Sequence, residues 1–251
     1  MGNGNRGNIM IIKNGLVFTP EGKFEKKDLY VEGEYVAKET TDNKEVEAEG
    51  CYVIPGLVDI HFHGCVRHDM CDGTEESIQA LADYEAANGV LAICPATMTI
   101  LEEELFQAMK AAKEHKNGKG ADLVGINMEG PFINEKYKGA QNPKYIYKPS
   151  FDFIKDYTDI IKVISYSPEL DKDFEFTKQV KKETDIVLSI CHSDASYSTG
   201  KEAKDLGVTN ITHLFNGMTP LNHRNPGVVG LGLMSDMYCE LIADKIHINK
   251  E

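Results

Sequence analysis

Two patterns of apolar and polar positions divide the chain near Pro55. Residues 10–53 contain short β-branched runs, and the pairs Asn14-Gly15 and Glu32-Gly33 fall between such runs, as the turns of β-hairpins do. We therefore predict a small N-terminal β-sandwich domain, in part, at residues 10–53. The Gly/Asn-rich residues 1–9 are expected to be a disordered leader.

After Pro55, short apolar runs alternate with amphipathic stretches. We expect one helix between Thr74, a capping residue type, and Gly89, and a second helix that ends at Gly118. The apolar runs of strand length begin near residues 57, 90, 122, 159, 185, 208 and 239. This alternation predicts parallel strands joined by right-handed crossovers. The expected fold is α/β: an incomplete TIM-type (β/α) barrel at residues 54–251, with its last strand and helix missing.

Four histidines and one glutamate stand at or near the carboxyl ends of these runs: His61, His63, Glu129, His192 and His213. In a parallel barrel those ends converge on one pocket. Alone, a His-x-His pair is more often a surface or packing feature, and a single histidine after a strand is more often a hydrogen-bonded core residue. The joint pattern favours a metal site, and imidazole with carboxylate suits Zn²⁺ or Fe²⁺. Hydrolysis by a metal-activated water is the chemistry that such a site implies.

Charge and cysteine content narrow the class of protein further. The net charge is −13, with 27 Lys and Arg against 40 Asp and Glu, so we expect no nucleic-acid or anionic-membrane partner. No apolar run approaches the roughly 18 residues that a membrane span needs. The six cysteines form no CxxC pair and no secretory signal precedes them, which favours reduced thiols in a cytoplasmic protein. An anionic substrate would need local basic groups.

The order of several motifs closely resembles the N-acetylglucosamine-6-phosphate deacetylases of the amidohydrolase superfamily. These motifs are VIPGLVDIHFHG, MEGPFIN, KGAQNP, SPE, CHSDA, THLFNGMTPLNHRNPG and ELIADKIH. The resemblance implies that Glu129, His192 and His213 hold a main metal ion, while His61 and His63 add a second site bridged by Glu129. It therefore implies one or two ions, Zn or Fe.

The same resemblance implies a grip on a phosphorylated amino sugar. The residues at matching positions are Ala140, Gln141, Asn216, Gly217, Arg224, Asp244 and His247. Arg224 offers a planar fork to phosphate oxygens, and His247 can donate to the same group. Members of the family are commonly homodimers in which an arginine reaches the neighbour's phosphate site, so Arg224 is a candidate for that role.

Two departures from the family pattern stand out. Gln141 occupies a position where the family usually has a histidine; glutamine can donate a hydrogen bond but cannot become a cation. The family's proton-transfer aspartate would lie beyond Glu251, so no catalytic residue is assigned in this chain, which is expected to be a C-terminally truncated member and itself weak or inactive.

The predicted function is hydrolysis of the N-acetyl group of N-acetylglucosamine 6-phosphate, giving glucosamine 6-phosphate and acetate. One alternative is an inactive metal-binding fragment that lacks the aspartate. Another is an amidohydrolase of the dihydroorotase type, in which a carboxylated lysine bridges two metals. Lys162 is the candidate lysine, but it stands at the start of its strand and should point away from the metals.

Overall fold

The structure is a computed structural model that describes residues 10–33, 35–39 and 44–251. The leader predicted at residues 1–9 lies outside the described residues. The chain forms two compact units, Met1–Gly56 and Leu57–Glu251.

The described part of the first unit is one five-stranded sheet with the order β3-β2-β1-β4, in which β5 also pairs with β1. Its strands are β1 (Met10–Phe18), β2 (Phe24–Glu32), β3 (Tyr35–Ala37), β4 (Glu45–Glu47) and β5 (Tyr52–Val53). Strands β1, β2 and β3 pair antiparallel, and β4 and β5 run parallel to β1.

One of the two turns predicted in this unit is wrong. Glu32 lies opposite Tyr35, so β2 and β3 do form a hairpin at Gly33. Asn14-Gly15, however, lies inside β1, where the register with β2 shifts. Asn14 adopts a left-handed φ of 61°, and its backbone N–H donates to the Asp28 carboxylate at 2.9 Å. The pair therefore makes a β-bulge rather than a turn, because Asn tolerates the left-handed conformation that an inserted residue needs.

The second unit contains a series of parallel strands, and it confirms the predicted α/β barrel architecture. The strands are β6 (Leu57–Asp59), β9 (Val90–Ile93), β10 (Asp122–Leu123), β11 (Ile126–Glu129), β12 (Ile161–Tyr166), β13 (Val187–Ile190), β14 (Asn210–Ile211) and β15 (Tyr238–Cys239). They form two parallel sheets, β10-β9-β6 and β11-β12-β13-β14-β15, and a parallel bridge between Ala96 and Asn127 links the two. A separate hairpin consists of β7 (Gly64–Cys65) and β8 (His68–Asp69).

Each of the predicted runs after Pro55 supplies a strand, and only the third is broken. β10 and β11 are its two halves, separated by Val124 and Gly125, the latter with a φ of 154°. A Cβ on Gly125 would lie 2.6 Å from the Ile160 carbonyl oxygen, so glycine lets the chain pass close to its neighbour.

The helices lie between the strands in sequence. They are α1 (Glu75–Ala87), α2 (Glu102–Glu114), α3 (Phe151–Ile154), α4 (Glu175–Glu183), α5 (Tyr197–Asp205) and α6 (Gly227–Met234). Short 3-10 turns complete the connections: η1 (Met70–Asp72), η2 (Glu135–Tyr137), η3 (Pro143–Tyr145), η4 (Lys155–Tyr157), η5 (Pro168–Leu170) and η6 (Lys172–Phe174). None of the helices in the described ranges combines the length and apolar character of a membrane span.

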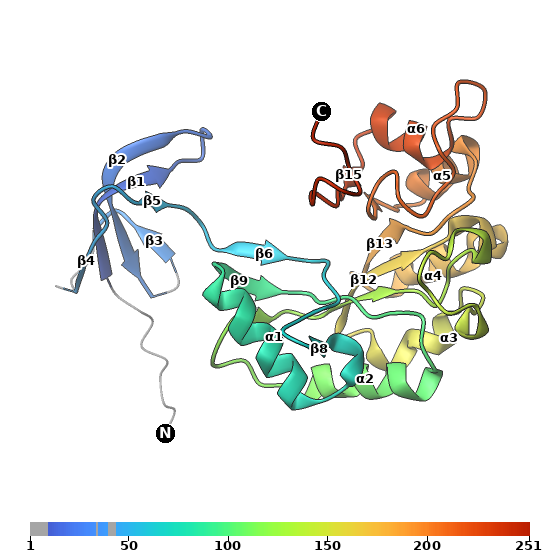
Figure 1. Cartoon of the computed structure of the whole chain (residues 1–251), viewed down its shortest axis with the longest axis horizontal. Helices are drawn as coiled ribbons and strands as arrows, with labels where there is room; N and C mark the ends of the chain where they lie inside the picture. The colour runs from blue at the N-terminus through green and yellow to red at the C-terminus, as the bar shows by residue number, and fades with distance from the viewer. Residues whose placement is uncertain (1–9, 34, 40–43) are drawn as a thin grey trace. The chain divides into compact units, whose positions relative to one another are not determined.

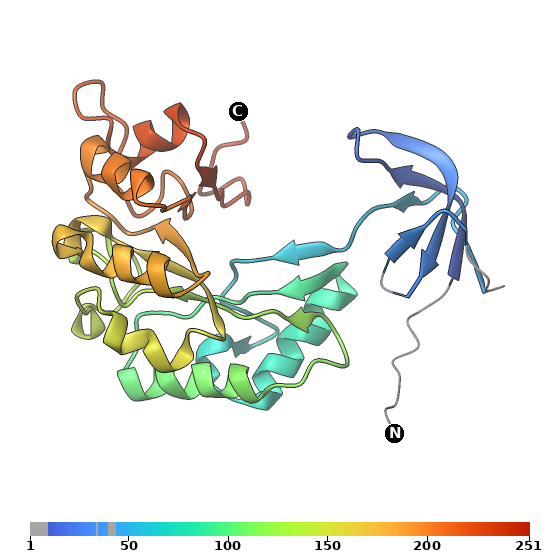
Figure 2. The ribbon, with the colours of Figure 1, turned by 180° about the vertical axis from the view of Figure 1, so that it is seen from behind.

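Helices α1 to α4 run along the outer side of the strand series (Figure 1). Figure 2 shows the same strands from behind, with β6 in cyan and the C-terminal segment in red. Thr74 caps α1 as expected, because its hydroxyl accepts the Ser77 N–H at 3.2 Å. α2 stops at Glu114 rather than at Gly118, since His115 is already extended with a ψ of 142°.

The core of this unit forms where the helices pack against the strands. Helix α2 contributes one face, made of Leu105, Ala108, Met109 and Ala112, all of them buried. The strands contribute side chains such as Met128, Ile164 and Leu188, which are fully buried. Burial of one such side chain stabilises the fold by about 1.5–3 kcal/mol, so this core fixes the strand ends on which the polar residues stand.

Candidate metal centre

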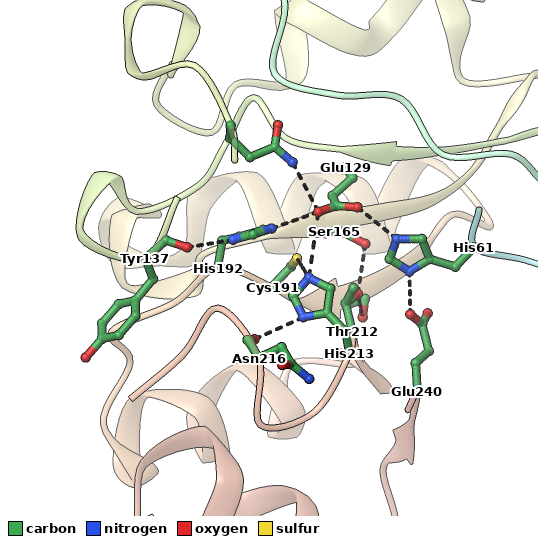
Figure 3. A network of polar contacts seen from close by, with 12 residues as sticks. His61, Glu129, Tyr137, Ser165, Cys191, His192, Thr212, His213, Asn216 and Glu240 are labelled. Carbon is green, nitrogen blue, oxygen red and sulfur yellow. Dashed lines mark hydrogen bonds and ion pairs between the residues drawn. The ribbon is translucent and has the colours of Figure 1, made fainter. Parts of the chain in front are cut away.

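Glu129, the last residue of β11, is the point on which the predicted ligands converge. His61 Nε2 lies 2.8 Å and His63 Nε2 3.2 Å from Glu129 Oε2. His192 Nε2 lies 2.7 Å and His213 Nε2 3.7 Å from Oε1. The Glu129 side chain is only 3 % exposed. The structure therefore brings all five residues together, as Figure 3 shows for Glu129, His61, His192 and His213.

Strand ends and unusual backbone angles aim these side chains inward. His61 and His63 follow β6, while His192 and His213 each come two residues after the end of β13 or β14. Both latter residues have left-handed φ values, 44° for His192 and 34° for His213. Such angles are costly for residues with a side chain and concentrate at functional sites.

Hydrogen bonds hold the strained residue His192 in place. Its carbonyl oxygen accepts from the Ser167 hydroxyl at 2.7 Å and from the Asn134 N–H at 3.0 Å. The next residues are tied down by Glu169, which accepts from the Ser193 hydroxyl at 2.7 Å. The position of the imidazole is thus determined by the loop on which it stands.

Three of the four imidazoles have an acceptor at Nδ1. His61 Nδ1 lies 2.6 Å from Glu240 Oε2, and His192 Nδ1 lies 2.6 Å from the Tyr137 carbonyl oxygen. His213 Nδ1 lies 3.0 Å from the Asn216 carbonyl oxygen. With a metal ion bound, an acceptor at Nδ1 would keep the proton there and leave the Nε2 lone pair of the neutral ring for the ion. The His63 Nδ1 atom is buried and has no partner within the described residues.

The electrostatics of the cluster favour a cation. Burial alone would raise the pKa of Glu129, but hydrogen bonds from His192, His213, His61 and His63 hold it well below its usual value. Burial alone would lower the pKa of His61, but its hydrogen bonds with Glu129 and Glu240 raise that pKa to about 10. The Glu129 carboxylate therefore stays charged and favours positive charge on the groups around it.

The donor atoms fall into two groups that could each hold a metal ion, and within each group they lie within 4.8 Å of one another. One consists of Glu129, Cys191, His192 and His213, and the other of His61, His63 and Glu129. Glu129 is common to both groups. The donor set thus fits one ion or two ions that share this carboxylate, and imidazole with carboxylate suits Zn²⁺ and Fe²⁺ alike.

Two residues at the centre were not predicted as site residues. Cys191 is fully buried, and its Sγ lies 3.5 Å from His213 Nε2. Burial raises the pKa of its thiol well above the usual value. Glu240 follows β15 and contacts His61. Cys191 stands directly before His192, and Glu240 stands at the start of the seventh predicted run.

Gln141, one of the predicted substrate residues, lies against Glu129. The Thr99 N–H donates to Gln141 Oε1 at 2.6 Å, so the amide nitrogen is the atom that faces Glu129 Oε1, at 3.1 Å. The side chain is buried, whereas the preceding Ala140 is exposed. Gln141 thereby helps to fix the orientation of the Glu129 carboxylate.

The other predicted substrate residues divide into two sets. Asn216 and Gly217 adjoin the centre, since Asn216 accepts from His213 and a Cβ on Gly217 would lie 2.8 Å from His192 Nδ1. Arg224, Asp244 and His247 are exposed, and no described hydrogen bond or ion pair joins them to the centre. Asp244 instead accepts from His247 Nδ1 at 2.7 Å, within the same turn.

A cavity of about 670 Å³ adjoins the centre. His61, His63, His213 and Glu240 line it with polar atoms, and Leu57, Val58 and Ile60 contribute apolar ones. Its size suits a small ligand. Lys162 is remote from this chemistry, because it is exposed and its Nζ donates to the Asp159 carbonyl oxygen at 2.9 Å, which weighs against a lysine-bridged centre.

Comparisons with known proteins agree with the motif resemblance. No family model matches the chain. An N-acetylglucosamine-6-phosphate deacetylase of Bacillus subtilis is 33 % identical over 248 residues, covering 94 % of this chain and 61 % of the relative.

Two solved structures bear the same enzyme name. The one from Thermotoga maritima is 29 % identical with a TM-score of 0.84, and the match covers 95 % of this chain and 64 % of the Thermotoga maritima chain. The one from Pasteurella multocida is 25 % identical with a TM-score of 0.87, covering 96 % and 66 %. The chain is thus homologous to N-acetylglucosamine-6-phosphate deacetylases and spans about three fifths to two thirds of their length.

Proposed function

We propose that this chain carries the metal centre of a deacetylase that hydrolyses N-acetylglucosamine 6-phosphate to glucosamine 6-phosphate and acetate. The single observation that carries the proposal is the convergence of four Nε2 atoms on the Glu129 carboxylate at 2.7 to 3.7 Å. The substrate is the one in the names of the homologues. Because the homologues are longer than this chain, we propose the activity of the whole enzyme for it by analogy with them.

In this proposal Glu129, His192 and His213 hold the main ion, and His61 and His63 complete a second site that shares Glu129. When bound, a Zn²⁺ or Fe²⁺ ion supplies an activated water near neutral pH and an electrophile for the amide carbonyl. The residues of the chain orient the site: the Tyr137 and Asn216 carbonyl oxygens hold the rings of His192 and His213. Gln141 holds the Glu129 carboxylate.

The phosphate would be bound by polar and basic groups on the connections that follow β14 and β15. Asn216 and Gly217 lie beside the metal ligands, and the exposed side chains of Arg224 and His247 would supply the positive charge. A local positive charge is needed because a chain with a net charge of −13 repels an anion overall. Arg224 suits the task because its guanidinium can bind two phosphate oxygens at once.

The proposal also includes a homodimer and a cytoplasmic location. The dimer rests on the motif resemblance, in which an arginine crosses the subunit interface, a role for which the exposed Arg224 is available. The location rests on the cysteines, all six of which are free thiols. Free thiols are typical of reducing compartments.

The test is acetate release from N-acetylglucosamine 6-phosphate by the 251-residue protein supplied with Zn²⁺ or Fe²⁺, for which we expect a slow but measurable rate. Glu129→Gln should reduce the rate by about 100-fold or more, because it removes the shared ligand. His115→Gln is the matched control, since this histidine is equally buried but lies outside the centre, and it should leave the rate unchanged.

Two outcomes would argue against the proposal. Bound metal without acetate release would favour the alternative of an inactive metal-binding protein. The absence of both bound metal and acetate release would contradict the proposal and this alternative alike.

A further inference from the structure

An unassigned carboxylate, that of Glu240, lies against the centre. Its backbone is fixed on both sides, because its N–H donates to the Ile211 carbonyl oxygen at 3.0 Å and its carbonyl oxygen accepts the Leu214 N–H at 2.8 Å. The side chain is 17 % exposed, and Oε2 lies 2.6 Å from His61 Nδ1. Its second oxygen, Oε1, is buried and has no hydrogen-bond partner within the described residues.

We infer that Glu240 is a positioning residue that sets the metal affinity of the second site, formed by His61, His63 and Glu129, separately from that of the main site. This inference rests on the proposed metal centre. Glu240 holds one edge of the His61 ring so that the opposite nitrogen, Nε2, faces Glu129 at 2.8 Å (Figure 3).

The partners of the other rings show why Glu240 acts on one site only. His192 and His213, which belong to the main site, are oriented by backbone carbonyl oxygens. Only His61 is oriented by a carboxylate, which carries a full negative charge and makes the imidazole a stronger ligand. His63 Nδ1 has no hydrogen-bond partner within the described residues. Of the two rings, only that of His61 is therefore held at Nδ1, and Glu240 is the residue that holds it.

The charge of Glu240 also bears on how many ions the centre can hold. Glu129 alone would share one negative charge between two divalent ions. Glu240, one imidazole ring away, supplies a second negative charge next to the His61 and His63 site. Because the surroundings are largely buried, this charge is poorly screened and favours a second cation.

Position in the fold explains how Glu240 reaches His61. His61 follows β6, the first strand of the series, and Glu240 follows β15, the last. In the described part of the chain, β6 and β15 do not pair with each other, so no backbone hydrogen bonds of a sheet join the two residues. The side-chain hydrogen bond between Glu240 and His61 therefore links the second site, beside the first strand, to the last strand of the series.

The test is a zinc titration of the metal-free protein against a competing chelator, which resolves binding at two sites of different affinity. Glu240→Ala should weaken one site by about 10-fold to 100-fold and leave the other unchanged. Glu240→Gln keeps an acceptor but removes the charge, so we expect a smaller loss, about 10-fold, at the same site. Glu85→Gln, which alters a buried glutamate on α1, is the matched control and should bind zinc as the unaltered protein does.

The outcomes separate this inference from the proposed function. Equal weakening of both sites, no change in Glu240→Ala, or a single ion bound by the unaltered protein would overturn the role of Glu240 and leave the main site intact. Absence of any bound zinc in the unaltered protein would overturn the metal centre itself. Circular dichroism of each variant shows that it is folded, and Glu240→Gln keeps the test decisive if Glu240→Ala is unfolded.

Discussion

The two histidines proposed for the main metal site stand on backbone that ordinary residues avoid. His192 and His213 both have left-handed φ values, and such a conformation costs about 1–3 kcal/mol for each residue. Bonds from Ser167 and Asn134 to the His192 carbonyl help to offset that cost. The cost is explained if the rings must point at Glu129 rather than continue the alternation of a strand.

Gly217 should be intolerant of any side chain. It has a φ of 59°, and a Cβ there would lie 2.8 Å from His192 Nδ1 and 3.3 Å from His213 Cε1. Gly217→Ala should therefore displace both rings, lower the free energy of unfolding by about 1–3 kcal/mol and weaken zinc binding at the main site. Urea denaturation and zinc titration measure the two effects.

Gly118→Ala provides the comparison for this prediction. Nothing lies within 4 Å of a Cβ at Gly118, so the change should alter the free energy of unfolding by no more than about 0.5 kcal/mol. If Gly217→Ala behaved like Gly118→Ala in both measurements, the close packing of the two rings against Gly217 would be refuted.

The five candidate ligands were predictable from the sequence because each stands at the end of an apolar run, and parallel strands bring such ends together. The roles of Gln141 and Glu240 were not predictable. Gln141 lies on the loop after β11, where it donates to Glu129 and accepts from the Thr99 N–H, and both partners belong to other segments of the chain. Glu240 contacts a residue 179 positions away in sequence, which no local pattern reveals.

At the scale of elements, hydrophobic periodicity predicted the positions of the strands well and the local irregularities poorly. The bulge at Asn14 and the break at Gly125 both depend on contacts with neighbouring strands, Asp28 in one case and Ile160 in the other. A two-residue signal such as Asn-Gly is compatible with a turn and with a bulge, because both use the left-handed conformation. Tertiary pairing decides between them.

The outer strands of the series expose apolar side chains beside unpaired backbone. In the described part of the chain β6 pairs only with β9, and β15 only with β14. Val58 on β6 is 60 % exposed, and Leu241 just beyond β15 is 54 % exposed. An exposed apolar edge strand is prone to pair with another chain.

We therefore expect the 251-residue protein to associate as its concentration rises. Val58→Lys should reduce that association, because a charge on an edge strand opposes strand pairing. Tyr84→Lys places the same charge on the outer face of α1, at a side chain that is 43 % exposed, and should not reduce it. Sedimentation velocity measures the association, and equal behaviour of both variants would count against the edge strands as its source.

At the scale of the whole molecule, the centre joins residues from five separate strand ends between His61 and Glu240. The second unit alone supplies every one of them. A site assembled from such distant positions forms only when the strand series forms, so metal binding and folding of this unit should be coupled. Glu129 is the one residue shared by both metal-binding groups.

The most direct measurement is therefore the number of zinc ions bound per chain, determined by metal analysis after dialysis at a fixed free zinc concentration. The unaltered protein should bind two ions, and Glu129→Gln should lose both, because both groups of donors depend on this carboxylate. His115→Gln should bind as the unaltered protein does. A protein that binds no zinc, or a Glu129→Gln variant that binds it undiminished, would contradict the account.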